Sequence, residues 1–482
     1  MQRIFSLLLF VSPAVLCASD VKSFGAVGNG LTDDTQSIQN AINACPANGT
    51  VTFTQGTYLV SGLFPRSQCT YSGSGNAMIR LSAPNRFIFD ISERENLHFT
   101  GLALDANQKG GVIYAGGNGP VRHLRIDNCD FRNVVSAAIF PANLALASLW
   151  GTVDGVIQNN RFSNIAGGIW LTTVQNVSIL NNSFTDVTQN DAIYVAPNPV
   201  PFQSGDNLRI AGNSGSHITN MGIEIFRPDP SNGSVLTAPI IENNSFSDWI
   251  GTGPNGMGLS ITHGDGAIIR NNRLNNANGP TQLIGIELIV TNAQVTGNVI
   301  SGGFYYGIVV QGKPGDTITG NTITGAGDTG ILLACSNELG RCNSNSTTIS
   351  GNAIHNPRLF GIKLDNEWSH SQITRNTIVR TAGLYPQDNT TLFSGISQSP
   401  AAGPGVIDFN TIVQDAISPT PGFWFCGIRI NSQMPGSTVR NNIVRSLSSS
   451  PFGSGLIDNT GNATQGWIIS GNTYLNVYHN IN

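Results

Sequence analysis

The sequence predicts an all-β protein, a right-handed parallel β-helix (solenoid) with an N-terminal capping helix. Three observations predict this fold: a recurring Asn motif, a Gly-Ile tetrad that follows it, and repeat spacings that share a minimum but vary in length. Each unit holds two or three short strands, too few to bury their own apolar face. Stacked coils bury a continuous core, and lengthened loops account for the variable spacing.

The first motif, from about residue 124 onward, reads apolar, any, any or Gly, Asn, any, apolar. Successive Asn positions lie between 22 residues (Asn160 to Asn182) and 34 residues (Asn376 to Asn410) apart. We expect each Asn to occupy a bend in the αL conformation and to donate its amide to the amide oxygen of the next coil. Cys129 takes the Asn position once and is interpreted as structural. The motif begins at Asn160, Asn182, Asn244, Asn272, Asn298, Asn321, Asn352, Asn376, Asn410, Asn441 and Asn472, with a partial copy at Asn213.

The second motif is Gly, Ile or Leu, any, apolar, as in Gly222-Ile223-Glu224-Ile225. Alternation along a strand turns its second and fourth residues inward and its third outward. Leucine-rich repeats and propellers lack this combination of an Asn bend with a Gly-Ile strand. The repeats therefore favour a β-helix whose third tetrad residues form one outward column.

The chain is interpreted as residues 1–18, a signal peptide, followed by a single β-helix domain over residues 19–482. A basic start, a short apolar run and a small residue at Ala18 predict export rather than a membrane span. Residues 19–60 are expected to hold the cap and first strands (Val51 to Phe53 and Tyr58 to Val60), and residues 124–482 the repeated coils. Thr32 or Asp33 is the predicted N-cap of the capping helix.

Composition and cysteine content agree with an exported β-rich protein. Charged residues make up 11% of the chain, its net charge is −4, and glycine occurs 56 times. Such a weak charge does not point to nucleic acid. An oxidising compartment favours disulfides, for which Cys335 with Cys342 is the first candidate pair and Cys45 with Cys69 the second, although the sequence does not fix the connectivity.

The N-terminal region resembles the opening of the pectate-lyase-like superfamily, which includes rhamnogalacturonase and epimerase-like proteins. The resemblance rests on Val21-Lys22-Ser23-Phe24-Gly25-Ala26, Gly28-Asn29-Gly30, Thr32-Asp33-Asp34-Thr35, Gly49-Thr50-Val51 and Gly56-Thr57-Tyr58. It implies a β-helix with carbohydrate-directed activity, but not one reaction, because the fold hosts lyases, hydrolases, epimerases and non-catalytic spikes. The four motifs typical of polygalacturonases are not reproduced. Asn190-Asp191 keeps only the second acid of the Asp-Asp motif, and Met221 and Met257 stand where the Gly-His-Gly motif has its histidine.

The outward column provides the candidate site. Glu224 and Glu287 are expected two coils apart, so that about 9.6 Å separates their backbones along the stack. This separation suits the carboxyls of an inverting enzyme better than those of a retaining one. Asp191 and Asp265 are candidate supporting acids, with Asp265 also a candidate calcium ligand. Two glutamates on a solvated strand face remain the alternative interpretation.

Aromatic and basic residues complete the candidate site. Trp170 and Tyr194 are expected to stack on sugar rings, unless a long loop covers them. Arg227 is a candidate for gripping a sugar carboxylate. Lys363 and Arg429, near Asp365, Glu367 and His370, suit β-elimination from a uronate, unless they form only a surface ion-pair patch.

The sequence therefore favours a secreted, extracellular or periplasmic protein that hydrolyses or lyses an acidic or plant-wall polysaccharide. The rival hypothesis is a non-catalytic carbohydrate-binding or surface-spike β-helix. The partner expected in both cases is a polysaccharide, without nucleic acid or membrane insertion. Calcium is the cofactor to consider if the reaction is a lyase reaction, and no metal ligands are assigned.

Overall fold

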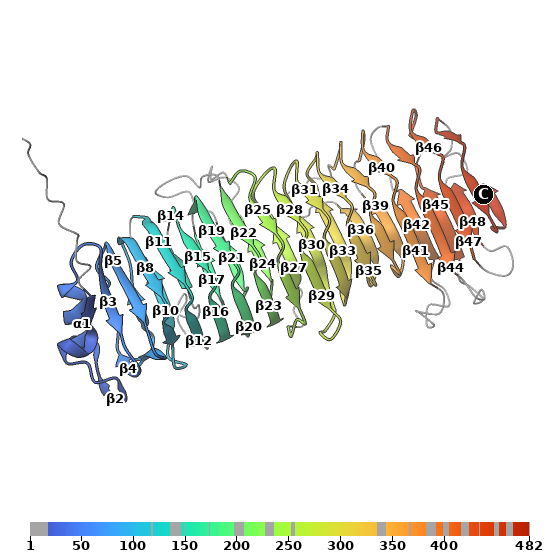
Figure 1. Cartoon of the computed structure of the whole chain (residues 1–482). Helices are drawn as coiled ribbons and strands as arrows, with labels where there is room; N and C mark the ends of the chain where they lie inside the picture. Colours follow the sequence, from blue (N-terminus) through green and yellow to red (C-terminus); the bar gives the residue numbers. More distant parts are fainter. Residues whose placement is uncertain are drawn as a thin grey trace, which may run out of the picture.

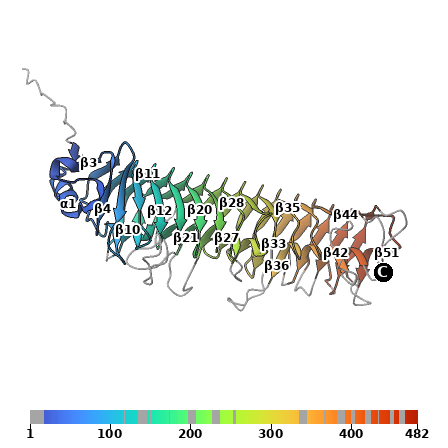
Figure 2. The same cartoon turned by 90° about the horizontal axis from the view of Figure 1, so that it is seen from below.

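The computed structural model describes residues 18–481 except 117–118, 135–145, 150, 173, 197–206, 227–235, 252–255, 335–343, 366–367, 382–391, 399–403, 416–423, 433, 448–452 and 459–465. Residues 1–17 of the predicted signal peptide, the predicted Cys335–Cys342 pair and Arg227 lie outside these residues. The described chain forms an elongated column of coils whose strands run across its long axis (Figures 1 and 2).

Three sheets of parallel strands line the column, and each coil contributes strands to them. Sheet A contains β1(Ala18–Asp20), β3(Gly49–Phe53), β5(Cys69–Gly73), β8(Glu95–Thr100), β11(Val121–Asp127), β14(Thr152–Val153), β15(Val156–Gln158), β18(Val174–Gln175), β19(Val177–Leu180), β22(Leu208–Ala211), β25(Ile240–Glu242), β28(Ile268–Arg270), β31(Gln294–Thr296), β34(Thr317–Thr319), β37(Thr348–Ser350), β40(Gln372–Thr374), β43(Val406–Asp408), β46(Thr438–Arg440) and β49(Ile468–Ser470).

Sheet B follows sheet A around each coil and contains β2(Asn29–Asp33), β4(Gly56–Val60), β6(Ala77–Leu81), β9(Ala103–Asp105), β12(Asp130–Val134), β16(Arg161–Ile165), β20(Ser183–Val187), β23(Ser214–Ile218), β26(Ser245–Ser247), β29(Arg273–Asn276), β32(Val299–Gly302), β35(Thr322–Thr324), β38(Ala353–His355), β41(Thr377–Thr381), β44(Thr411–Asp415), β47(Ile443–Ser446) and β50(Thr473–Leu475).

Sheet C closes each coil and carries the Gly-Ile tetrads. It contains β7(Phe87–Asp90), β10(Gly111–Ala115), β13(Leu146–Leu149), β17(Ile169–Leu171), β21(Ile193–Val195), β24(Ile223–Ile225), β27(Met257–Ile261), β30(Gln282–Leu288), β33(Phe304–Gln311), β36(Thr329–Ala334), β39(Phe360–Leu364), β42(Leu392–Gln398), β45(Trp424–Ile430), β48(Ser454–Asp458) and β51(His479–Ile481).

The interior of the column is a stack of matching side chains, because strands in register place like residues above one another. The rings of Phe131, Phe162 and Phe184 stack with centroids 4.7 Å apart. The tetrad glycines face neighbouring backbone: a Cβ on Gly307 would lie 2.4 Å from the Gly330 oxygen. Glycine avoids this clash, which explains why most tetrads begin with it, although Ala192 holds the same position in the coil of β21.

The predicted amide ladder between sheets A and B is confirmed. The side chain of Asn272 donates to the Asn298 amide oxygen and to the Ile241 carbonyl, both at 2.9 Å, and its oxygen accepts from Asn244. Cys129 occupies the ladder position, since its backbone N–H donates to the Asn160 amide oxygen at 2.9 Å. The same side-chain donation links Asn160, Asn182, Asn213, Asn244, Asn272, Asn298, Asn321, Asn352, Asn376, Asn410, Asn442 and Asn472.

Two details of the ladder prediction are wrong. The αL residue is the one before each ladder Asn, such as Asn271 (φ 55°), and not the ladder residue itself. The bend needs one left-handed residue, after which the next side chain turns into the stack. For the same reason the ladder residue of its coil is Asn442, buried, whereas the predicted Asn441 has φ 55° and lies outside the ladder.

The N-terminal coils stack without the Asn motif. Strands β3 and β4 coincide with the predicted first strands, and the parallel pairing continues through β5, β6, β8 and β9. The stacked coils therefore begin well before residue 124, the predicted boundary. The sequence pattern misses them because Leu102 occupies the position that pairs with the Cys129 slot, so no polar ladder marks these coils.

One helix, α1(Thr35–Ala44), and a short 3-10 helix, η1(Val21–Phe24), lie at the N-terminal end of the column (Figure 1). Ile38, Ala41 and Ile42 of α1 are fully buried in the core. The N-cap residue is Asp34, not the predicted Thr32 or Asp33, which belong to β2. The Asp34 carboxylate accepts the backbone N–H groups of Val27 and Gly28 and so fixes the preceding turn.

Candidate functional site

The outward column of sheet C aligns the candidate residues coil by coil. Trp170 pairs with Tyr194, Tyr194 with Glu224, Glu224 with Ser260, and Ser260 with Glu287. Glu224 and Glu287 are thus two strand spacings apart on one face, about 9.6 Å along the stack. The tetrad pattern therefore predicted which residues share this outward column.

A second outward column lies three residues earlier on each coil. Asp191 begins it, and Met221, Met257 and Ile284 continue it through β24, β27 and β30. These apolar side chains are buried and pack with Val309 and Leu332 in a cluster separate from the interior core. The acids of the face therefore lie beside apolar rather than open, solvated surface.

Asp191 and Glu224 form a hydrogen-bonded carboxyl pair. Asp191 is 6% exposed, and its Oδ1 accepts the Asn220 amide at 2.7 Å and the Met221 N–H at 2.8 Å. With these donors facing Asp191, the shared proton resides on Glu224, whose O–H donates to the Asp191 carboxylate. Like charges in contact favour one shared proton over two ionised groups.

Burial shifts both members of the pair in the same direction. Burial raises the pKa of Asp191 to about 6, against the opposing hydrogen bonds from Met221, Glu224 and Asn220. Burial, followed by the negative charge of Asp191, raises the pKa of Glu224 to about 9. Because the two groups titrate as a unit, the first proton leaves near the lower value and Glu224 stays protonated at neutral pH.

Glu287 has a different environment. The Ser260 hydroxyl donates to its Oε2 at 2.7 Å, and the Gln311 amide donates to its Oε1 at 2.5 Å. Both oxygens of Glu287 therefore accept hydrogen bonds. The face thus carries a protonated carboxyl on one coil and, two coils further on, a carboxyl that accepts hydrogen bonds at both oxygens.

Aromatic rings flank the acids on the N-terminal side. The Trp170 and Tyr194 rings meet edge to face with centroids 4.8 Å apart, and Tyr194 also contacts Phe226 at 6.4 Å. Burial, then the charges of Glu224 and Asp191, raises the pKa of the Tyr194 phenol. Strand β13, which pairs with β17, supplies the coil before Trp170.

The remaining predicted residues lie away from this group. Asp265 is exposed at the turn into β28, where its carboxylate accepts the Thr291 N–H at 3.0 Å. Lys363 lies in the same column but three coils beyond Glu287, and its ammonium pairs with Asp365 at 2.5 Å. Arg429 lies two coils further still.

The sequence pattern gave no role to the residues that hold the acids. Ser260 and Gln311 contact Glu287, and Asn220 and the Met221 backbone contact Asp191. Ser260 was visible as the column residue between the two glutamates. The contact with Gln311 joins different columns and different coils, which the repeat alone does not reveal.

Metal ligands and membrane helices were also sought. In the described part of the chain, no group of three or more His, Cys, Asp and Glu side chains is arranged to hold a metal ion. No helix within the same residues has the length and apolar character needed to cross a bilayer.

Comparison with known proteins identifies the family. Residues 229–480, more than half of the chain, match the family described as right handed beta helix region, and the chain belongs to this family. A comparison with curated proteins finds no significant match.

Solved structures that align with TM-scores of 0.50 or above show the same fold. The Dettilon tailspike protein aligns with a TM-score of 0.52 at 15% identity, over 76% of this chain and 66% of that one. The surface adhesin PfbA of Streptococcus pneumoniae gives 0.50 at 16% identity over 76% and 90%. The mannuronan C-5 epimerase AlgE6 A-module of Azotobacter vinelandii gives 0.41 at 18% identity over 80% and 99%. These likenesses concern the fold.

Proposed function

We propose that the protein is a secreted glycan-active enzyme that hydrolyses an acidic or plant-wall polysaccharide along the outer face of sheet C. The observation that carries the proposal is the grouping of three acids on one face, with Asp191 and Glu224 on adjacent coils and Glu287 two coils further on. One carboxyl holds a proton at neutral pH while another accepts two hydrogen bonds. Carboxyls with such different environments divide the acid and base roles in glycosidases.

Each carboxyl receives one role. Glu224 protonates the glycosidic oxygen as its bond to the anomeric carbon breaks. Glu287 accepts a proton from the water that attacks this carbon from the opposite side. Asp191 is a positioning residue, because its charge keeps the proton on Glu224 until the leaving oxygen takes it.

The spacing favours inversion of the anomeric carbon. Two strand spacings separate the backbones of Glu224 and Glu287 by about 9.6 Å, near the upper end of the range for inverting enzymes. A retaining enzyme needs its nucleophile within about 5.5 Å of the acid, which is closer to a single strand spacing. A nuclear magnetic resonance spectrum of the first product anomer tests this assignment.

The activity test is a screen of pectin, rhamnogalacturonan, alginate and xylan. New reducing ends without ultraviolet absorbance from unsaturated uronates support hydrolysis. Unsaturated products instead would identify a lyase and overturn the assigned roles. Saturable binding without cleavage in every case would favour the non-catalytic alternative, a carbohydrate-binding or surface β-helix.

The same proposal covers the organisation of the chain. Residues 1–18 act as the signal peptide, and residues 19–482 form one domain that works outside the cytoplasm. Helix α1 covers the N-terminal end of the column, where its residues Ile38 and Ile42 are buried. Without this helix, core side chains of the first coil would be exposed to water. Mass spectrometry of the exported protein locates the cleavage site.

A further inference from the structure

The N-terminal end of the column carries a hollow that the acid centre does not explain. It is an open hollow of about 440 Å³ between α1 and the segment after β4, and this volume is within the range of small-molecule binding pockets. Its lining includes Phe64, Arg66, Arg94, Gln39 and Asn43. Two cations, several neutral polar groups and one aromatic ring line it, and no carboxylate does.

The exposed ring and the arginines are the unusual features. Phe64 is 59% exposed and lines both this hollow and a second one of about 460 Å³. Within the described part of the chain, the buried Nε of Arg94 has no hydrogen-bond partner. Glu93 and Glu95 flank Arg94 in sequence but do not line the hollow. A ligand that accepts hydrogen bonds and bears negative charge would satisfy the cations.

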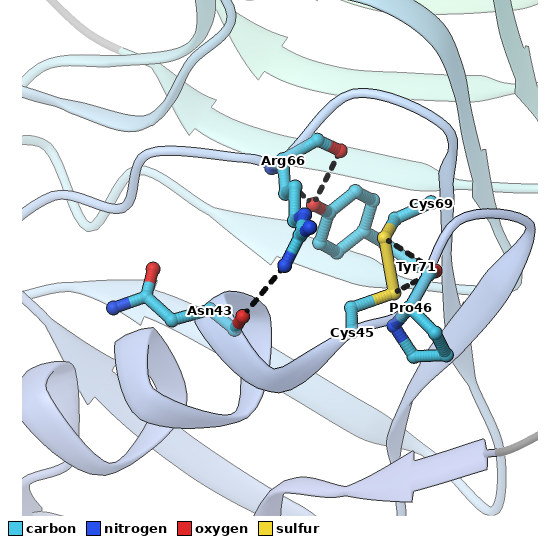
Figure 3. The surroundings of a disulfide bond; sticks show 6 residues. All are labelled: Asn43, Cys45, Pro46, Arg66, Cys69 and Tyr71. Carbon is cyan, nitrogen blue, oxygen red and sulfur yellow. Dashed lines mark hydrogen bonds between the residues drawn. A yellow bond between two sulfur atoms is a disulfide. The ribbon is translucent and has the colours of Figure 1, made fainter.

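Bonds between the lining residues and their neighbours fix the walls of the hollow, and Figure 3 shows those around the disulfide. The disulfide between Cys45 and Cys69 links the end of α1 to β5, and Arg66 Nη1 donates to the Asn43 carbonyl at 2.9 Å. The Arg66 N–H donates to the Tyr71 hydroxyl at 2.7 Å. Gln39 binds both the N–H and the carbonyl of Phe64. A site fixed before binding loses little entropy when its ligand arrives.

The hollow also has a fixed relation to the proposed acid centre. Leu63, next to Phe64, pairs with Phe89 of β7, so this segment begins the stack of sheet C. Six strand spacings, about 29 Å, separate it from β24 and Glu224. The stacked rings of Phe87 and Tyr114 lie between them on the first coils.

We propose that this hollow is a second binding site for an acidic sugar, in which Arg94 and Arg66 bind the anionic group and Phe64 stacks on the ring. Its assignment to the same polymer that Glu224 cleaves rests on the proposed function. The anionic group is a uronate carboxylate or a sulfate ester, since both offer the oxygens that arginine binds. The site would then hold a long chain several sugars away from the bond being broken.

The test uses the full chain with Glu224→Gln, so that no turnover occurs. Oligogalacturonate, its methyl-esterified uncharged form and a sulfated galactan oligosaccharide are titrated by calorimetry. One charged probe should bind saturably and the uncharged one at least about tenfold more weakly. Arg94→Gln and Phe64→Ala should each weaken binding about tenfold, whereas Arg161→Gln and Phe409→Ala, with an exposed cation and ring elsewhere, should not.

Two results would overturn the proposal: failure of both charged probes to bind, or equal weakening by the control variants. Unchanged thermal unfolding of Arg94→Gln shows that a loss of binding is not a folding defect, and Phe64→Ala removes an exposed ring without touching the core. The binding is measured without catalysis. A failure of the binding test would therefore not contradict the proposed acid centre. Likewise, an acid centre without activity would not contradict the binding result.

Discussion

The amide ladder and the acid centre are two groups of polar side chains in the same stack of coils. In the ladder, Asn272 both donates and accepts, so every coil satisfies the next. In the acid centre, Asp191 and Glu224 face each other, and two ionised carboxyls would only accept. One of the two carboxyls must therefore keep a proton to donate, and burial raises the pKa of Glu224 to about 9.

The difference teaches that stacking alone does not make a site. Repetition of a group with both donors and acceptors gives a stable, inert column. Acidic groups on neighbouring coils beside buried Met221 and Met257 give perturbed acidity instead. The following predictions test each side of this comparison, from the largest expected effect to the smallest.

Removing either proposed catalytic carboxyl should have the largest effect. Glu224→Gln and Glu287→Gln should each lower kcat by about 10²–10⁴-fold, because each deletes a proton transfer in the transition state. The measurement is release of reducing ends from the glycan identified in the screen. Asp186→Asn, at a half-exposed carboxyl of β20 that pairs with His217, is the control and should leave kcat unchanged. Full activity in both glutamine variants would refute the assignment.

Breaking the ladder should have the largest effect on stability. Asn272→Ala leaves Asn244 and the Ile241 carbonyl without their partners and should cost about 2–4 kcal/mol, seen as a lower Tm and as lost amide protection in nearby coils. Asn271→Ala, at the adjacent exposed αL residue, should cost only about 1 kcal/mol. Equal effects would mean that the ladder amides do not stabilise the stack.

The carboxyl pair predicts a particular pH profile. Activity should rise as the pair loses its first proton near pH 6 and fall as Glu224 loses its proton near pH 9. Asp191→Asn removes a charge that raises the pKa of Glu224, so the alkaline limb should move about one pH unit lower or more. An unmoved limb in a folded, active variant would show that Asp191 does not act through Glu224.

Repairing the ladder should have the smallest effect. Cys129→Asn places an amide where the Cys129 N–H already donates to the Asn160 oxygen. The new amide N–H groups would donate to the Asn160 oxygen and to a carbonyl of the preceding coil, as those of Asn160 donate to the Asn182 oxygen and the Ile126 carbonyl. We expect Tm to stay equal or to rise by an amount equivalent to less than about 1 kcal/mol. A clear loss of stability would indicate that the ladder does not extend beyond Asn160.

Local patterns predicted the repeat and the direction of its side chains better than its turns. The tetrads identified the outward column that contains Glu224, Ser260 and Glu287, because period-two alternation is a local property. The αL residues were assigned one position too late, since both Asn271 and Asn272 suit a bend by composition. Only the stacking of coils decides which of the two turns inward.

The candidate site was predictable in its column residues but not in its contacts. Asp191 was singled out beside Tyr194, yet its contact with Glu224 crosses from one column to the other. Asp265 looked equally suitable in sequence, and the structure turns it to Thr291 at a corner. Loop lengths and corner angles set these positions. Because neither of them repeats from coil to coil, the sequence pattern does not predict them.

The sequence by itself determined the solenoid, its polar ladder and the face on which two glutamates stand two coils apart, because repeated local preferences add up along a stack. The tertiary structure decided which carboxyls touch and which are buried, and therefore which carry a proton. These properties depend on distances between separate coils, and acidity responds to burial and neighbouring charge rather than to residue type alone.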